Sequence, residues 1–354
     1  MTGRLRSDGT AEWSDPTEAS TLYARGYFGT LQPGGGLRLD RYETAYLTEM
    51  GRAEVQGPRA QATSWPEVFR RAARAEPGFG VRYLVYRDLR QRGYVVRSSP
   101  PPIAFAVLPR GGTLNKTPAR YWVDALSERS PFDLGHLLGL TDRAQATKKS
   151  LLLGVVDEES DLTYYRLKLS QPTGALTAAP LDTVATGWLS EDRVLLFDPG
   201  PVASLGRNLA YGSQVGARLE LSLLEAAYLQ ETGQLVLRDA RSGRAIPRAQ
   251  FDRRAARLDR RFNERLATYR HLRGRRLVVK TGFKYGAHFR AYPRNPEQVH
   301  ARYLVQAVPM HHVAAWSEIA GAVRVAQGVR KEFLLAAVDS NAPPRFLAIE
   351  RIRP

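Results

Sequence analysis

The strongest constraint on the fold is an internal repeat with an offset of 182 residues. A fixed offset that persists along most of a chain is typical of a tandem duplication. We therefore expect two units of the same fold, joined at a seam in Ser170–Ala179. The matching segments are ETAYLTEMG at 43–51 with EAAYLQETG at 225–233, RYWV at 120–123 with RYLV at 302–305, and AQATKK at 144–149 with AQGVRK at 326–331.

Each unit is expected to contain two lobes in which helices and strands alternate. The order of elements predicts an α+β or α/β fold in which each unit has an N-terminal α/β lobe and a C-terminal lobe built on a mixed sheet. The predicted lobes are 1–75, 76–172, 173–258 and 259–354. Strands are expected at Leu22–Phe28 and Leu37–Leu39, and helices at about 40–50, 64–75, 81–92, 221–230, 248–257 and 261–273, with Ser64 opening a capping box.

The charge balance indicates a polyanionic partner. The chain has 354 residues, and its 52 basic against 35 acidic side chains give a net charge of +17. Such an excess attracts nucleic acid first, because every neutralised phosphate releases counterions. An anionic membrane surface is the second partner to consider, but no basic amphipathic segment with a clear apolar face supports it.

The chain contains no cysteine. Disulfides, thiolate zinc sites and cysteine nucleophiles are therefore excluded. No run of 18 apolar residues and no apolar signal core are present, so we expect a cytoplasmic protein.

Three residues in the second half could together cleave RNA without a metal ion. Tyr292 could take a proton from a ribose 2′-OH, and His300 could protonate the departing 5′ oxygen. Lys331 could stabilise the charge that builds up on the phosphate oxygens. Each residue alone is more often structural: a buried or surface tyrosine, a hydrogen-bonded histidine, a solvated lysine.

The segments around these residues resemble the tRNA-splicing endonuclease family. They read VKTGFKYGAHFRAY at 279–292, PEQVHARYLV at 296–305 and RVAQGVRKEFLLAAVD at 324–339. The resemblance implies that Tyr292 is the base, His300 the acid and Lys331 the transition-state clamp of a ribonuclease-A-like reaction. It further implies 2′,3′-cyclic phosphate and 5′-hydroxyl products and no metal or other cofactor. Tyr285 is the rival tyrosine, but it lies 15 residues before His300, and the family spacing is shorter.

The repeat provides an internal comparison for these three positions. Alignment of the two halves places Leu108, Pro118 and Lys149 opposite them. Leucine and proline do not titrate, so the first unit is expected to be catalytically inactive. Lys149 also shows that a lysine at this position persists without catalysis.

The resemblance extends to archaeal members in which a pseudo-catalytic and a catalytic unit are fused and two chains form a homodimer. It implies a restriction-endonuclease-like C-terminal lobe in each unit. In this family an acidic loop of the structural unit enters a basic cleft of the opposite protomer. The corresponding loop here contains Asp157, Glu158, Glu159 and Asp161, although an ordinary charged hairpin turn explains it equally well from sequence alone.

The expected partner is a precursor tRNA with a bulge–helix–bulge at its exon–intron junctions. In-line attack requires an unstacked nucleotide, and family members hold a bulge base between two arginines. Arg324 fits the first arginine, and Arg345 is a looser match for the second. Two alternatives remain: a non-catalytic basic RNA- or DNA-binding scaffold, and a metal-dependent nuclease. A metal-dependent nuclease needs clustered carboxylates, whereas only Glu297 and Glu332 are close in sequence to the three candidates.

Overall fold

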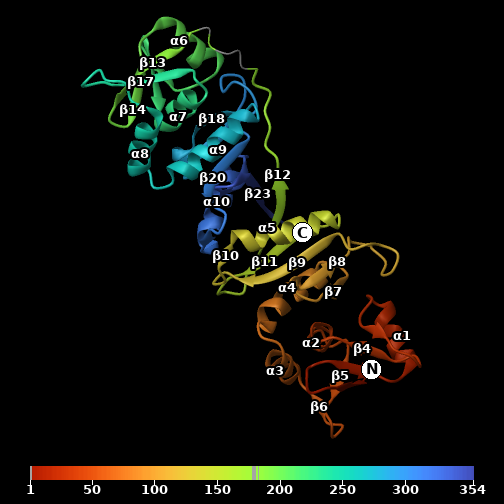
Figure 1. Cartoon of the computed structure of the whole chain (residues 1–354). Coiled ribbons are helices and arrows are strands. Elements are labelled where there is room, and N and C mark those ends of the chain that lie inside the picture. Colours follow the sequence, from red (N-terminus) through yellow and green to blue (C-terminus); the bar gives the residue numbers. More distant parts are fainter. Residues whose placement is uncertain (1, 178–180, 182) are drawn as a thin grey trace. The chain divides into compact units, whose positions relative to one another are not determined.

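The computed structural model describes residues 2–177, 181 and 183–354 (Figure 1). The predicted seam ends at Ala178 and Ala179, which lie outside the described residues. The chain divides into two compact units. The first comprises Met1–Pro131, Gly139–Leu167 and Arg351–Pro354, and the second comprises Phe132–Leu138 and Lys168–Glu350.

The N-terminal lobe of the first unit is a six-stranded sheet with three helices. The strand order is β3-β4-β2-β1-β5-β6. The strand expected at Leu22–Phe28 is wrong: Asp15 accepts hydrogen bonds from the first backbone amides of a helix, and Pro16 opens it. The capping box expected at Ser64 is also wrong, because its side chain makes no capping bond, although the helix begins there. The elements are β1 (Thr2–Leu5), β2 (Ala11–Trp13), α1 (Pro16–Ala24), β3 (Thr30–Leu31), β4 (Leu37–Leu39), α2 (Arg41–Glu49), β5 (Glu54–Gln56), β6 (Ala62–Thr63) and α3 (Trp65–Ala75).

The C-terminal lobe of the first unit is a mixed sheet with the strand order β7-β8-β9-β11-β12. Strands β9 and β11 are parallel, and the chain between them passes through a helix, as a parallel connection requires. A hairpin joins β11 to β12. The elements are α4 (Phe79–Gln91), β7 (Val96–Ser98), β8 (Phe105–Val107), β9 (Tyr121–Ser127), α5 (Leu134–Ala146), β11 (Ser150–Val156) and β12 (Leu162–Ser170).

The second unit repeats this plan. Its N-terminal lobe has the strand order β15-β16-β14-β13-β17, and its C-terminal lobe has the order β18-β19-β20-β22-β23. Its N-terminal lobe contains β13 (Ala185–Ser190), β14 (Arg193–Leu196), α6 (Pro199–Ala203), η1 (Ser204–Asn208), β15 (Ser213–Val215), β16 (Arg218–Ser222), α7 (Leu223–Glu231), β17 (Leu235–Asp239) and α8 (Arg248–Leu258). Its C-terminal lobe contains α9 (Phe262–Gly274), β18 (Val278–Thr281), η2 (Phe283–Tyr285), β19 (Phe289–Tyr292), β20 (Tyr303–Pro309), α10 (Trp316–Gly328), β22 (Glu332–Asp339) and β23 (Ala342–Ile352), and β10 (Phe132–Asp133) pairs with β21 (Val313–Ala314).

Buried polar contacts confirm the duplication. Glu43 and Glu225 each complete a capping box at the start of α2 and α7. Their carboxylates accept hydrogen bonds from equivalent glycine amides, at 2.9 Å and 2.8 Å respectively. In both units a buried arginine lies over an aromatic ring. Arg90 of α4 lies 3.7 Å from the centre of the Phe28 ring, and Arg273 of α9 lies 4.0 Å from that of Tyr211. The mixed α+β architecture with duplicated lobe pairs is therefore as predicted.

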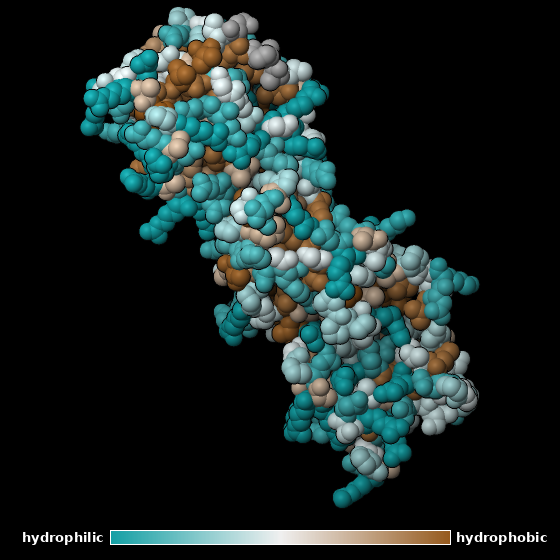
Figure 2. Space-filling view, viewed as in Figure 1, coloured by the Kyte–Doolittle hydropathy of each residue, from teal (hydrophilic) through white to brown (hydrophobic). Residues whose placement is uncertain are grey.

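The surface is mostly hydrophilic, as expected for a highly charged chain. Figure 2 shows apolar residues gathered over the part of the second unit that contains α6 and β13. The exposed apolar side chains of this lobe include Val184 before β13, Phe197 before α6 and Val236 in β17. Among the described residues, no helix is long and apolar enough to span a bilayer.

Candidate functional site

The strand register places the three candidate residues at one end of one sheet. Tyr292 is the last residue of β19, His300 lies three residues before β20, and Lys331 immediately precedes β22. Strand β20 is antiparallel to β19 and parallel to β22. The last residue of β19 and the first residues of β20 and β22 therefore lie at the same end of the sheet.

Tyr292 and Lys331 lie at the same level of the sheet on either side of β20. Their neighbours Ala291 and Glu332 both pair with Tyr303. Two inter-strand spacings of about 4.8 Å therefore separate their backbones, roughly 10 Å in all. Side chains of ordinary length can meet across that gap.

Tyr292 is held by a small apolar cluster. Its ring packs with Ala210, Val278 and Ala301 and is 8% exposed. The alternation of side chains along β19 directs Phe289 and Ala291 into the main core and leaves Tyr292 on the opposite face. The backbone and ring of this tyrosine are therefore fixed by packing.

Lys331 lines a cavity of about 470 Å³. Its Nζ atom donates a hydrogen bond to the Val329 carbonyl at 3.1 Å. The same cavity is lined by Lys168, Arg302 and Arg330, of which Arg302 pairs with Glu332 at 3.0 Å. Glu332 and Glu350 also line the cavity, so basic side chains exceed acidic ones there, which suits a phosphate group.

His300 is exposed in the connection between β19 and β20. A turn in this connection is closed by hydrogen bonds from the amides of Gln298 and Val299 to the Asn295 carbonyl, at 2.9 Å and 3.3 Å. The Asn295 side chain also donates to the Arg207 carbonyl at 3.3 Å. The imidazole therefore faces solvent at the end of an anchored turn.

Tyr285, which the family spacing disfavours as the base, lies close to Lys331 and shares Arg290 as a neighbour with Tyr292. The Lys331 Nζ atom lies 5.6 Å from the centre of the Tyr285 ring. The Arg290 guanidinium carbon lies 5.8 Å from the Tyr285 ring and 5.9 Å from the Tyr292 ring. Sequence spacing could not reveal this contact, because it depends on the fold of the β18–β19 turn.

His288, close in sequence to the site, has a structural environment. Burial lowers its pKa to about 4, and its Nδ1 atom accepts a hydrogen bond from the Ala307 amide at 3.0 Å. It is therefore neutral near pH 7. No group of three or more histidine or carboxylate side chains suited to a metal ion occurs in the described parts of the chain.

The two predicted base-binding arginines lie in different places. Arg324 is exposed on α10, seven residues before Lys331. Arg345 pairs with Ala337 on β22, whereas Lys331 precedes the other end of that strand. Six residues of strand correspond to about 20 Å. The structure therefore does not bring Arg345 to Lys331.

The first unit has the same strand register at the equivalent positions. Val107, Tyr121 and Ser150 pair across its sheet in the positions of Ala291, Tyr303 and Glu332. Leu108 follows the first of these residues, and Lys149 precedes the third, so they occupy the positions of Tyr292 and Lys331. The register thus agrees with the sequence alignment of the two halves.

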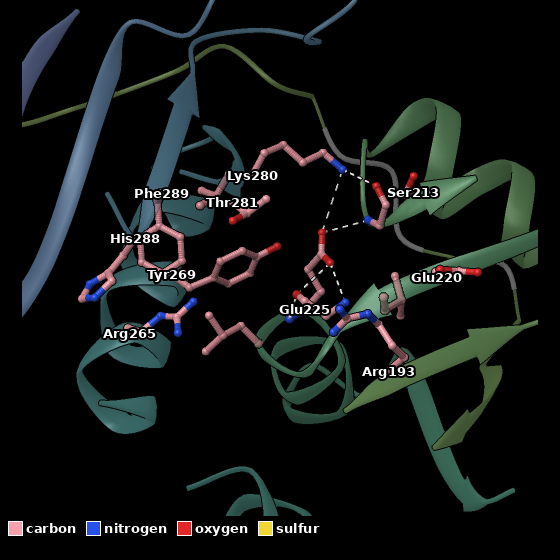
Figure 3. A pocket seen from close by; sticks show the side chains of 15 residues that line it. Arg193, Ser213, Glu220, Glu225, Arg265, Tyr269, Lys280, Thr281, His288 and Phe289 are labelled. Carbon is pink, nitrogen blue, oxygen red and sulfur yellow. Dashed lines mark hydrogen bonds and ion pairs between the residues drawn. The ribbon is translucent and has the colours of Figure 1, made fainter. Parts of the chain in front are cut away.

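The second unit contains a cleft of about 400 Å³ that the sequence did not indicate (Figure 3). Arg193, Arg265 and Lys280 line it together with Glu220 and Glu225. The Lys280 Nζ atom donates to the Gly212 carbonyl at 2.6 Å and lies 3.9 Å from Glu225. Burial lowers the pKa of this lysine. The Arg193 side chain, in contrast, is 59% exposed and remains accessible to a partner.

The acidic loop is an exposed hairpin tip between β11 and β12. Asp157 accepts hydrogen bonds from the Glu159 and Asp161 amides at 3.0 Å and 2.8 Å. Glu158 forms a 3.1 Å ion pair with Arg129 in which both side chains are mainly exposed. The tip is therefore ordered by its own hydrogen bonds, and its carboxylates face solvent.

Comparison with known proteins identifies the family. The catalytic C-terminal domain of tRNA intron endonuclease matches residues 79–164 and 262–343, and the N-terminal domain of the same family matches residues 1–68 and 185–251. Among curated relatives, the tRNA-splicing endonuclease of Methanosarcina acetivorans is 36% identical over 94% of each chain. That of Natronomonas pharaonis is 35% identical over the full length of both chains. The chain therefore belongs to the tRNA intron endonuclease family, with both of the family's domains present twice.

Proposed function

We propose that this protein is a tRNA-splicing endonuclease that cleaves precursor tRNA at both exon–intron junctions, at a bulge–helix–bulge. One observation supports the proposal most. Strand β19 ends at Tyr292 where β20 and β22 begin, next to His300 and Lys331, and the equivalent positions of the first unit hold Leu108, Pro118 and Lys149. The relatives that match over nearly the whole chain are tRNA-splicing endonucleases, which supports cleavage of precursor tRNA but says nothing of its chemistry.

The proposed reaction is an internal transesterification. The phenolate form of Tyr292 removes the proton from the ribose 2′-OH and becomes the phenol, and the ribose oxygen attacks the adjacent phosphorus. The bond from phosphorus to the 5′ oxygen breaks, and His300 supplies the proton that this oxygen takes. Lys331 stabilises the additional negative charge on the phosphate. The products are a 2′,3′-cyclic phosphate and a 5′-hydroxyl, and no metal is required because the nucleophile belongs to the substrate.

Recognition of the bulge is proposed to rest on stacking by arginine. Arg324 is exposed on α10 and is free to contact an unstacked base. Arg345, which lies on β23 opposite Ala337 of β22, contacts a more distant part of the same RNA. The net charge of +17 supplies the sequence-independent part of the affinity.

Two cuts in one intron require two active sites, so we expect a homodimer. The acidic loop at Asp157–Asp161 is proposed to enter the cleft of the opposite protomer that contains Arg193, Arg265 and Lys280. The loop carboxylates are exposed, and Arg193, although paired with Asp192 at 2.9 Å, is 59% exposed, so it is the cation of the cleft that we expect the loop to contact.

A cleavage assay with an intron-containing precursor tRNA tests the proposal. His300→Ala should bind the RNA almost as tightly as the natural chain but cleave it ~10²–10⁴-fold more slowly. His300 is exposed, so the substitution should leave the fold intact. Undiminished cleavage by this variant would remove His300 from the reaction. A natural chain that binds but never cleaves would instead support a scaffold.

A further inference from the structure

Phe283 is unusually exposed. Its side chain is 85% accessible, the highest value among the large apolar side chains of the described residues. Single exposed apolar residues are ordinary on protein surfaces. Phe283 differs from such residues because an ordered turn holds it and because it lies close in sequence to Tyr285, which contacts Lys331.

The turn that carries Phe283 is well ordered by backbone hydrogen bonds. The Tyr285 amide donates to the Gly282 carbonyl at 2.8 Å, and the Gly286 amide donates to the Phe283 carbonyl at 3.1 Å. Gly286 adopts a positive φ of 65°, and a Cβ atom on Gly282 would come within 2.6 Å of the Ala287 carbonyl. The ring is therefore displayed on a rigid support, so little conformational entropy is lost when a ligand binds it.

The turn adjoins the candidate active site. Tyr285, two residues after Phe283, lies against Lys331 and Arg290. Lys284, between the two aromatic residues, is exposed. The turn ends at Phe289, three residues or about 10 Å along β19 from Tyr292.

The first unit lacks these aromatic residues. Its equivalent turn lies between the paired residues Ser98 and Phe105, as the turn of the second unit lies between Thr281 and Phe289. It reads Ser-Pro-Pro-Pro-Ile-Ala, with no aromatic or charged side chain. The exposed ring and its adjacent lysine therefore occur only in the unit that contains Tyr292 and His300.

We infer that Phe283 is a stacking platform for an unpaired base of the RNA, close to the scissile phosphate. This inference rests on the proposed function and adds a contact to it. An exposed flat ring binds the face of any base, and Lys284 provides charge for the flanking phosphate. The contact would hold the strand next to the bulge while the reactive nucleotide enters the site.

Binding and single-turnover cleavage of a precursor tRNA by Phe283→Ala test the inference. We expect roughly 5- to 150-fold weaker binding, the range for loss of one base–aromatic stack. Phe283→Trp should retain the affinity. The salt dependence of binding should be unchanged in Phe283→Ala and reduced by about one phosphate contact in Lys284→Ala. Because Phe283 and Lys284 are both exposed, none of the three variants should change the thermal unfolding temperature.

RNAs with single abasic positions locate the contact. The penalty of Phe283→Ala should disappear at the one abasic position whose base stacks on the ring and persist at the others. Equal binding by Phe283→Ala and the natural chain would overturn the inference, as would a penalty that no abasic position removes. Loss of dimer in sedimentation with unchanged RNA binding would assign Phe283 to a contact between chains instead. If the natural chain itself fails to cleave, the proposed function fails, whereas normal cleavage with an unaffected Phe283→Ala rejects only the stacking contact.

Discussion

Removing the phenol oxygen from Tyr292 or from Tyr285 tests which of these two tyrosines acts as the general base. Tyr292 is 8% exposed, so truncation to alanine would cost about 3–5 kcal/mol of stability and confuse any kinetic result. Tyr292→Phe keeps the ring in its cluster with Val278 and Ala301 and deletes only the proposed base. We therefore expect the free energy of unfolding to change by less than about 1 kcal/mol.

The expected kinetic effect is large. Loss of a general base lowers the rate by ~10²–10⁴-fold, or about 3–5 kcal/mol of activation free energy. The matched control is Tyr285→Phe, because the Tyr285 ring lies 5.6 Å from the Lys331 Nζ atom. That variant keeps the ring and should cleave at nearly the natural rate.

Single-turnover cleavage of precursor tRNA, with enzyme in excess, measures both variants free of product release. Thermal unfolding of each variant provides the control for folding. A slow Tyr285→Phe beside a normal Tyr292→Phe would refute the assignment and make Tyr285 the base. Normal rates in both variants would refute a tyrosine base altogether.

Two further predictions concern assembly and pH. Replacing Glu158 and Asp161 with lysine should convert the dimer to monomer in sedimentation velocity at physiological salt, and an unchanged dimer would place the interface elsewhere. Burial lowers the pKa of folded His288 to about 4, against 6.5 for the ordinary group, so the unfolded chain takes up the proton between these values. The contribution of His288 to the free energy of unfolding should be complete above pH 6.5. The free energy of unfolding should then fall by about 1–3 kcal/mol as the pH drops toward 4, allowing for solvent screening. Chemical denaturation across this range should show a smaller loss in His288→Asn, and an equal loss in both chains would assign the effect to other groups.

The lobes and most helices could be predicted because the repeated segments carry local signals for helix starts, helix ends and buried faces. The helix expected at 248–257 is α8, and the one expected at 261–273 is α9, each within a residue or two. Leu22 belongs to α1 and not to a strand, because Asp15 and Pro16 start a helix that continues into this apolar segment. Local signals for helix starts therefore outweighed an apolar run.

Features that depend on distant contacts could not be predicted. The cleft in the second unit joins Arg193 on β14 with Lys280 on β18, far apart in sequence. The approach of Tyr285 to Lys331 requires a turn to fold back over the sheet. The exposure of Phe283 could not be predicted either, since phenylalanine is most often buried.

Identification of the RNA ends left after cleavage tests the central claim most directly. The natural chain should be incubated with precursor tRNA in EDTA, and the excised intron analysed by mass spectrometry. The account predicts a 5′-hydroxyl and a 2′,3′-cyclic phosphate at each junction, because the attacking oxygen is the neighbouring 2′-OH. A 5′-phosphate with a 3′-hydroxyl, or cleavage that stops in EDTA, would contradict it.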